Sequence, residues 1–305
     1  MAGFSGLTLW RARRHEHSAE TSHPPEGEII EVQGHKVHGV VTGHGPDIVL
    51  VHGSSGNTRE FTFSLAGKLA PDYRVTVLDR PGLGYSDRIN RSGATIAEQA
   101  GLLADAAEQL GARQPMVLGQ SYGGAVALAW AVHHPDRLSA LVTIAGVSHP
   151  WDTPLDTYYK LTSHPVLGHL VIPLLTAYVP DRKVSETIAE IFTPNEEPEG
   201  YDAHIGTGLT LRRHSLRANA MQRRNLLDEI VDLHKRYGDI SAPLEIVHGE
   251  ADDIVPAWNH AERLVKDVPG ANLTLLPGIG HMPHHSAEED VIAAIHRTAA
   301  RAGLR

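Results

Sequence analysis

The chain has 305 residues, no cysteine and a formal net charge of −9. This length allows one large domain or two modest ones with a full apolar core, and the absence of cysteine excludes disulfides, thiolate metal sites and cysteine nucleophiles. The acidic balance argues against a nucleic-acid partner, which would require a basic face, so we expect a small-molecule ligand.

The N-terminal stretch is mildly apolar up to Trp10 and continues with Arg11, Arg13 and Arg14. A signal peptide carries its basic residues before the apolar ones, so this order does not favour one, and the cytoplasm is the expected location. No stretch approaches the roughly 18 unbroken apolar residues of a transmembrane span, so we expect none. We interpret residues 1–25 as a loosely ordered extension, with a weak contact to a membrane surface or a partner as a hypothesis.

Short apolar strands alternate with helices from residue 28 onward. Strands are predicted at 28–33, 36–42, 47–51, 73–78, 114–118, 138–145, 243–247 and 272–276. Helices are predicted at 58–70, 95–110, from the turn at 119–123 to about 134, and at 226–237, 256–266 and 286–300. The first two strands are expected to form an antiparallel pair. The later alternation indicates crossover connections and a parallel sheet that is covered on both faces.

The alternation stops at Gly146 and resumes near residue 225. The segment between them, 147–224, is predicted to be helical and to form a cap inserted into a core domain of residues 26–146 and 225–305. Such an insertion would lie over the carboxyl ends of the strands, where open α/β sheets bind ligands. The apolar run 166–175 either lines an acyl pocket or packs the cap on the core, and the sequence leaves both interpretations open.

A sharp turn, Gly119-Gln120-Ser121-Tyr122-Gly123, joins an apolar strand to an alanine-rich helix. Gly119 and Gly123 occupy positions where a Cβ would collide with a neighbouring strand or helix. Ser121 would therefore stand exposed at a helix N-terminus, where free N–H groups and the helix dipole favour developing negative charge. A G-x-S-x-G pattern also occurs by chance, but the strand before it and the helix after it favour a nucleophile.

A serine nucleophile needs an imidazole to take its proton and a carboxylate to orient the imidazole. The loop after strand 243–247 contains Asp252 and Asp253, and the loop after strand 272–276 contains His281. Both loops leave the carboxyl ends of parallel strands, which is the sheet edge where Ser121 is expected. His284 and His285 are alternatives to His281, although they lie further along, where the closing helix begins.

With these residues the chain resembles the α/β-hydrolase fold superfamily over residues 28–302. The matching motifs are His52-Gly53, Asp79-Arg80-Pro81-Gly82-x-Gly84-x-Ser86, Gly119-x-Ser121-x-Gly123-Gly124, Gly249-x-x-Asp252-x-Ile254-Val255-Pro256 and Gly280-His281. The order serine, aspartate, histidine is that of the family. The resemblance implies an α/β fold with a mostly parallel, doubly wound sheet of about eight strands and a helical cap.

The resemblance also implies residue roles. Ser121 would be the nucleophile, His281 the general base and then acid, and Asp252 the orienting carboxylate, which the spacing from Gly249 favours over Asp253. The backbone N–H groups of Ser54 and Tyr122 would form the oxyanion hole. Loop-shaping roles are implied for His52, Gly53, Gly119 and Gly123, and for Asp79, which we expect to pair with Arg80.

No metal or cofactor is expected. The histidine groups, which include His15/His17, His133/His134 and His284/His285, do not have the spacing of a known metal site together with a third ligand nearby.

Ser121 points away from haloalkane dehalogenases and epoxide hydrolases, whose pattern has aspartate at this position, and residues 52–55 lack the His-Gly-Gly-Pro of proline iminopeptidases. We expect a serine hydrolase that cleaves a small, apolar carboxylic ester or lactone through an acyl-enzyme. One alternative is a carbon–carbon bond hydrolase of a vinylogous diketone acid, in which arginines of 211–217 or 223–224 would hold the substrate carboxylate. Others are a cofactor-free perhydrolase and a non-catalytic ligand-binding or receptor member of the fold.

Overall fold

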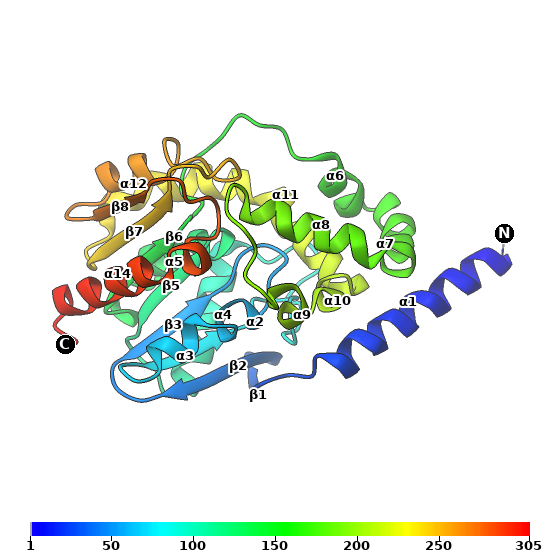
Figure 1. Cartoon of the computed structure of the whole chain (residues 1–305), viewed down its shortest axis with the longest axis horizontal. Coiled ribbons are helices and arrows are strands. Elements are labelled where there is room, and N and C mark those ends of the chain that lie inside the picture. Colours follow the sequence, from blue (N-terminus) through cyan, green and yellow to red (C-terminus); the bar gives the residue numbers. More distant parts are fainter. Residues whose placement is uncertain (1) are drawn as a thin grey trace.

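An eight-stranded sheet forms the centre of the computed structural model, which describes residues 2–305 (Figure 1). The strands are β1 (Glu28–Val32), β2 (His35–Gly43), β3 (Asp47–Val51), β4 (Arg74–Leu78), β5 (Met116–Gln120), β6 (Ala140–Ile144), β7 (Leu244–Gly249) and β8 (Asn272–Leu276). Their spatial order is β1-β2-β4-β3-β5-β6-β7-β8. β2 is antiparallel to β1 and β4, and the remaining pairs are parallel. The predicted fold class is therefore confirmed.

The strand registers bring several carboxyl ends to one sheet edge. Val51 at the end of β3 pairs with Gly119 of β5, and Gln120 pairs with Ile144 at the end of β6. Ile144 pairs in turn with Val247, and Gly249 at the end of β7 pairs with Leu276 at the end of β8. The loops that follow β3, β5, β7 and β8 therefore start at the same edge, which is where the sequence predicts the site.

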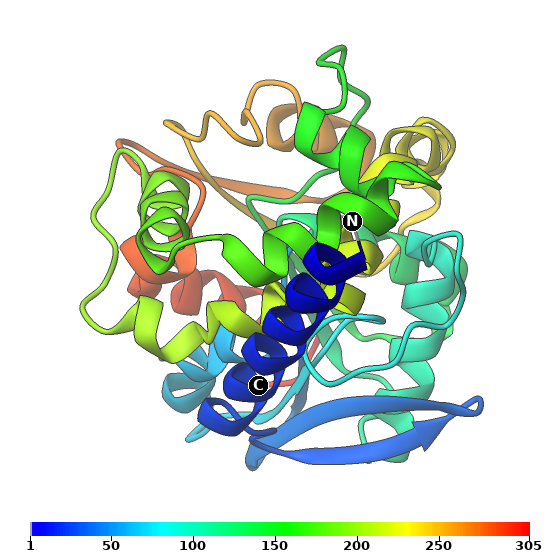
Figure 2. The same ribbon diagram turned by 90° about the vertical axis from the view of Figure 1, so that its right-hand side faces the viewer.

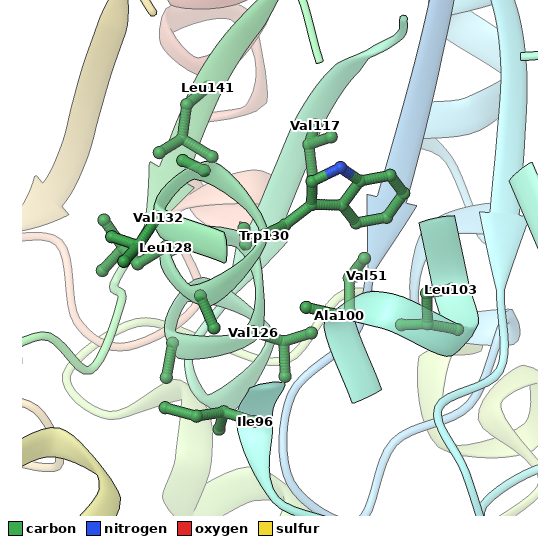
Figure 3. Close-up of a cluster of buried hydrophobic side chains, with 14 of the residues drawn as sticks. Val51, Ile96, Ala100, Leu103, Val117, Val126, Leu128, Trp130, Val132 and Leu141 are labelled. Carbon is green, nitrogen blue, oxygen red and sulfur yellow. The ribbon is translucent and has the colours of Figure 1, made fainter. Parts of the chain in front are cut away.

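The sheet is covered on both faces by helices. They are α2 (Arg59–Thr62), α3 (Leu65–Leu69), α4 (Ile96–Gln109), α5 (Tyr122–His133), α12 (Ala261–Asp267), α13 (Pro283–Ser286) and α14 (Glu288–Arg301). Alternate strand residues face opposite sides of the sheet. Val51 and Val117 pack with α4 and α5 around Trp130 (Figure 3). Leu50 and Leu118 face the opposite side and pack in a second core cluster with α3 and α14. The helix expected at 58–70 is split into two, because Ser64 leaves the helical conformation at φ −147°.

Six α-helices and a short 3-10 helix, His234–Asp239, connect β6 to β7. The α-helices are α6 (Thr157–Ser163), α7 (Leu167–Tyr178), α8 (Asp181–Phe192), α9 (Tyr201–Ile205), α10 (Thr207–Thr210) and α11 (Arg213–Leu233). As expected, the described residues of 147–224 contain no strand. The predicted cap boundary at residue 224 falls inside α11, whose later half packs Leu226, Ile230 and Leu233 into the core. The inserted segment therefore has no flexible link at its C-terminal end.

The N-terminal stretch differs from the prediction of a loosely ordered extension, although Met1 lies outside the described residues. Residues Ala2–Ser22 form one helix, α1, which runs alongside α7 and α10 (Figure 2). Ala12 and Ala19 are buried in this contact. Glu16 forms an ion pair with Arg213 at 2.7 Å, and Glu20 forms one with Arg212 at 3.0 Å. The expectation was wrong because the helix is held by partners about 190 positions away, which the local sequence does not indicate.

Candidate active site

Ser121 lies at the turn between β5 and α5 and has a strained backbone, with φ 53° and ψ −117°. A Cβ at Gly119 would overlap the carbonyl oxygen of Gly123, and a Cβ at Gly123 would overlap that of Val51, so both positions require glycine. The Ser121 N–H donates to Ile144 O at 2.9 Å. Strain of this kind persists only where the surroundings fix it, and here it holds the serine side chain at the sheet edge.

Ser121, His281 and Asp252 form a hydrogen-bonded chain. His281 Nε2 lies 3.0 Å from Ser121 Oγ, and His281 Nδ1 lies 2.8 Å from Asp252 Oδ2. Because the carboxylate can only accept, Nδ1 carries the ring proton and Nε2 accepts from the serine hydroxyl. The imidazole therefore has its basic nitrogen directed at the serine, which is the arrangement needed to remove the serine proton.

Asp252 is buried, and hydrogen bonds hold both of its oxygens. Oδ1 accepts the N–H groups of Ile254 at 2.9 Å and Val255 at 2.8 Å. Burial raises the pKa of Asp252, but hydrogen bonds from His248 and His281 outweigh it and hold this pKa well below its usual range. The other candidate, Asp253, is exposed and makes no hydrogen bond or ion pair within residues 2–305. The geometry therefore joins His281 to Asp252 and not to Asp253.

The loop after β3 lies against the serine, because a Cβ at Gly53 would come within 3.1 Å of Ser121 Cβ. His52 fixes this loop: its Nδ1–H donates to Gly53 O at 2.9 Å, and its Nε2 accepts the Arg80 N–H at 3.0 Å. Burial, and then the charge of Arg80, lowers the pKa of His52 to about 4, so the ring is neutral near pH 7. The backbone N–H groups of Ser54 and Tyr122 donate to no acceptor in the described part of the chain. Both are free to bind a ligand.

Asp79 and Arg80 do not pair with each other, contrary to the prediction. Asp79 accepts from Thr58 N at 2.8 Å, Tyr85 N at 2.8 Å and His38 Nδ1 at 2.6 Å, which agrees with a loop-shaping role. The Arg80 guanidinium is instead directed toward hydrogen-bond acceptors that include the loop after β3.

Arg80 is fully buried and forms no ion pair with any residue of 2–305. Its guanidinium donates to Gly53 O at 2.8 Å, to Gln99 Oε1 at 3.0 Å and to Gln222 Oε1 at 2.6 Å, and it stacks 3.9 Å above the Tyr122 ring. Gly53 O therefore accepts hydrogen bonds from both Arg80 and His52. Because this carbonyl belongs to the same peptide group as the Ser54 N–H, both bonds polarise that N–H.

Comparison with known proteins supports the fold. A sequence model of the α/β hydrolase fold matches residues 46–164, the part that contains the loop after β3 and the serine turn. The chain has the fold of the α/β hydrolases.

Among the relatives of this α/β hydrolase is the 2-hydroxy-6-oxononadienedioate/2-hydroxy-6-oxononatrienedioate hydrolase of Klebsiella pneumoniae. The two are 29% identical over 251 residues, which is 77% of this chain and 80% of the relative. The enol-lactonase of Burkholderia xenovorans has a TM-score of 0.73 and 16% identity, covering 90% of this chain and all of the other. A thermophilic esterase of Thermogutta terrifontis has a TM-score of 0.70 and 22% identity, covering 90% and 99%. At these identities the two structures establish the fold alone.

Residues of the inserted segment hold the loop after β3 of the hydrolase in place. Ser55 has φ 60°, which is strained for a residue other than glycine. Its N–H donates to Asn219 Oδ1 at 3.1 Å, and its carbonyl accepts from Thr210 Oγ1 at 2.5 Å. On the opposite side, Asn195 Oδ1 accepts the Gly280 N–H at 2.9 Å, next to His281. Sequence reasoning missed these polar residues, because nothing in their local pattern distinguishes them from solvated side chains.

His284 and His285 do not contact Ser121 but bind Glu60. Their Nε2–H groups donate to Glu60 Oε1 at 2.9 and 2.7 Å, and Tyr201 OH donates to Oε2 at 2.8 Å. The ligand atoms of these three His and Glu residues lie within 4.8 Å of one another. The expectation that no third ligand lies near this histidine pair was therefore wrong, because the fold brings in a carboxylate 224 positions away.

Both oxygens of the Glu60 carboxylate accept hydrogen bonds, so no bound cation is needed to compensate for its burial. Burial raises the pKa of Glu60, but the bonds from His284 and His285 outweigh it and hold this pKa well below its usual range. Since Tyr201 belongs to α9 and His284 and His285 to α13, the network ties the inserted segment to the chain that follows His281.

The buried histidines lead to a prediction about stability and pH. Burial is the main cause that lowers the pKa of His52 to about 4, of His260 to about 3 and of His284 to about 4. Unfolded histidines have a pKa near 6.5, so below that pH the unfolded chain binds protons that the folded hydrolase excludes. The unfolding free energy is therefore expected to fall as the pH drops from 7 to 5, by roughly 1 kcal/mol or more per buried histidine.

Urea unfolding at pH 7, 6 and 5 measures this dependence. His260→Gln should flatten it, because the amide oxygen can accept the backbone N–H groups that His260 Nδ1 accepts and does not titrate. His17→Gln serves as the matched control at an exposed histidine and should leave the slope unchanged. A free energy that stays constant between pH 7 and pH 5 would contradict the prediction.

Proposed function

We propose that this α/β hydrolase is a serine hydrolase that cleaves a small, apolar carboxylic ester or lactone through an acyl-enzyme. The observation that carries the proposal is the chain of hydrogen bonds from Ser121 Oγ through His281 to Asp252. In this proposal Ser121 is the nucleophile, His281 the general base and then acid, and Asp252 the group that fixes the imidazole tautomer.

In the first half-reaction His281 Nε2 takes the Ser121 proton while Oγ attacks the substrate carbonyl carbon. The developing oxyanion accepts hydrogen bonds from the N–H groups of Ser54 and Tyr122, which have no acceptor of their own in residues 2–305. Each such donor stabilises the transition state by about 3 kcal/mol. The buried Arg80 and the neutral His52 support the Ser54 donor because both bind the carbonyl of the same peptide group.

The second part of the cycle reverses these proton movements. His281 gives its proton to the leaving alkoxide, which departs as an alcohol or, for a lactone, stays attached to the acyl chain. Water then enters, His281 removes its proton, and the hydroxide attacks the acyl carbon. Collapse of the second tetrahedral intermediate breaks the bond to Oγ, which regains the proton from His281.

In this proposal residues 147–224 act as a cap that encloses the substrate. Support comes from hydrogen bonds that join the segment to both sides of the site, through Asn219 and Thr210 to Ser55 and through Asn195 to Gly280. A cap fixed in this way limits the entry of water, which strengthens every hydrogen bond to the oxyanion.

Hydrolysis of short p-nitrophenyl esters and lactones tests the function directly. We expect turnover by the wild type and stoichiometric labelling by a fluorophosphonate that is lost in Ser121→Ala. Labelling without turnover on any ester or lactone would contradict the proposed substrate class. The absence of both from the folded protein would favour a ligand-binding member of the fold.

A second candidate is a carbon–carbon bond hydrolase of a vinylogous diketone acid, in which Ser121 would attack a ketone carbonyl. The observation that favours it is Arg223, whose buried Nε has no hydrogen-bond partner in residues 2–305. Its guanidinium stacks 5.4 Å from the Tyr159 ring, and after burial its charge is a further cause that lowers the pKa of Arg80 to about 10. The Klebsiella relative is named for a dioate substrate. A guanidinium that forms no ion pair within residues 2–305 and lies near Arg80 is suited to bind a substrate carboxylate.

Three of the other arginines of the predicted carboxylate-binding group are already occupied, and the fourth, Arg224, is exposed. Arg212 binds Glu20 and the carbonyl of Gly84, Arg213 binds Glu16, and Arg217 binds the carbonyls of Thr162 and His164. Arg223 is therefore the arginine of this group best suited to an acidic substrate.

Arg223→Gln separates the two candidates, with Arg224→Gln as the matched control at the exposed neighbouring position. If the substrate is a diketone acid, Arg223→Gln should raise its KM about 10-fold or more, as expected for the loss of a charged hydrogen bond. KM for a neutral ester should stay unchanged in both variants. Equal effects of the two substitutions would contradict a carboxylate-binding role for Arg223.

A further inference from the structure

Large apolar side chains are exposed together on one side of the molecule. Of the fifteen such side chains in the described chain, ten belong to α1, α6, α7 or the turn before α7. We call these ten the apolar face: Leu7, Leu9, Trp10, Tyr158, Leu161, Val166, Leu167, Leu170, Leu174 and Tyr178. The three helices lie on the same side in both views (Figures 1 and 2), and α7 contacts both α1 and α6.

The arrangement on each helix exposes these residues together. Leu167, Leu170, Leu174 and Tyr178 follow one another at spacings of three and four residues, which puts them on one side of α7. On α1, the buried residues Ala12 and Ala19 face the protein, whereas Trp10 is 56% exposed. Monomeric proteins seldom gather exposed apolar side chains in this way without a partner surface.

The charged residues that lie among those of the apolar face along the chain are basic, although Asp156 lies at the start of α6 and Glu16 follows Arg14 in α1. Within residues 2–15 and 157–180 the charged side chains are Arg11, Arg13, Arg14 and Lys160, and neither stretch contains Asp or Glu, although the whole chain carries a net charge of −9. None of the three arginines forms an ion pair with any residue of 2–305. Arg11 lies 4.7 Å from the Tyr178 ring, and Arg14 lies 5.6 Å from the Trp10 ring. The cations are therefore free and lie beside exposed apolar and aromatic groups.

We propose that the apolar face binds the surface of an anionic lipid bilayer, with α1 and α7 lying in the interface. Leu7, Trp10 and Leu170 would enter the boundary between headgroups and acyl chains, and the arginines of α1 would bind lipid phosphates. In this proposal α1 and α7 lie on the surface of the bilayer and do not cross it, because no helix among residues 2–305 is long and apolar enough to span a membrane.

Two features favour lipid over a second copy of the chain. A symmetric dimer through this face would bring two clusters of unpaired arginines together, which is unfavourable. The acidic residues of α1, Glu16 and Glu20, lie in its later half and are bound to Arg213 and Arg212. These ion pairs hold α1 against the protein, so its basic and apolar first half is presented in a fixed orientation.

Binding to vesicles tests the proposal. In flotation assays the wild type should bind vesicles of phosphatidylcholine with phosphatidylglycerol, bind pure phosphatidylcholine much more weakly, and lose affinity as salt is raised. Changing Arg11, Arg13 and Arg14 to Gln should weaken binding to the anionic vesicles about 100-fold and remove most of the salt dependence. Trp10→Ser combined with Leu170→Ser should weaken binding to both kinds of vesicle.

Trp258→Ser provides the matched control, since Trp258 is 69% exposed and lies outside the apolar face. Fluorescence of the milder variants gives a second measurement that is independent of folding defects. A blue shift on vesicle binding should disappear in Trp10→Phe and persist in Trp258→Phe.

Three results would overturn the proposal. They are equal binding to neutral and anionic vesicles, a loss of binding in Trp258→Ser as large as in the Trp10/Leu170 variant, and a solution dimer of the wild type that Trp10→Ser with Leu170→Ser converts to a monomer. The assays do not depend on the substrate, so their outcome is independent of the proposed esterase activity.

Discussion

Ser121→Ala is expected to lower kcat/KM for the best ester substrate by roughly 10⁴-fold to 10⁶-fold. The physical reason is that the variant has no nucleophile, while His281 and the free N–H groups of Ser54 and Tyr122 remain in place. The remaining activity would come from the oxyanion donors and from binding alone. Steady-state kinetics with a chromogenic ester, at enzyme concentrations high enough to detect the residual rate, measures the effect.

The fold should tolerate this change. Ser121 Oγ makes one hydrogen bond to His281, worth about 1 kcal/mol, and the strained backbone is fixed by Gly119, Gly123 and the bond from Ser121 N to Ile144 O. Circular dichroism and the unfolding temperature should stay near the wild-type values. A folded variant that keeps more than about a tenth of the wild-type activity would contradict the assignment of Ser121 as nucleophile.

The parts of the site that the sequence predicts are those that local chemistry specifies. A strand, two obligatory glycines and a helix define the turn at Ser121, and the strands before residues 252 and 281 place their loops at the same sheet edge. Each of these signals spans fewer than about ten residues and repeats what the tertiary structure requires. The order of Ser121, Asp252 and His281 along the chain, together with the parallel strand registers, is therefore sufficient to bring the three residues together.

The parts that the sequence does not predict depend on contacts between distant positions. Arg80 looks like a loop residue that would pair with Asp79, yet it is buried because Gln222 of α11 and Gly53 supply its acceptors. Glu60 and the pair His284/His285 give no local sign of meeting. The helix α1 has few features of an amphipathic helix in sequence, and its order comes from α7, α10 and two arginines of α11 or its N-cap.

Asp252→Asn is expected to lower kcat by about 10⁴-fold, as for other triads in which the orienting carboxylate becomes an amide. The hydrogen bonds explain why the loss is large. The N–H groups of Ile254 and Val255 both donate to Oδ1, so the amide oxygen of asparagine must occupy that position. The amide NH₂ then faces His281 Nδ1, which lies 2.8 Å from Oδ2 in the wild type. His281 can meet a donor there only by moving its proton to Nε2.

With the proton on Nε2, His281 can no longer accept the proton of Ser121, so the nucleophile stays neutral. His248 does not offer the amide NH₂ an alternative acceptor. Its Nε2–H donates to Val255 O at 2.6 Å and Nε2 lies 3.2 Å from Asp252 Oδ2, so this nitrogen also presents a proton near the amide. The opposite orientation of the amide would set its NH₂ against two backbone donors, which cannot change tautomer. Asparagine is therefore incompatible with the active tautomer in either orientation.

Asp253→Asn is the matched control, because it makes the same chemical change at the exposed neighbouring position, and we expect its kcat to stay within about twofold of the wild type, as for a surface substitution. Asp252→Ala should lose no more activity than Asp252→Asn, since alanine leaves His281 free to adopt the active tautomer part of the time. Combining Asp252→Asn with Ser121→Ala should lower the rate little beyond Ser121→Ala, because the two residues act as one unit. Nearly wild-type kinetics for Asp252→Asn, or a large loss in Asp253→Asn, would assign the orienting carboxylate to another residue.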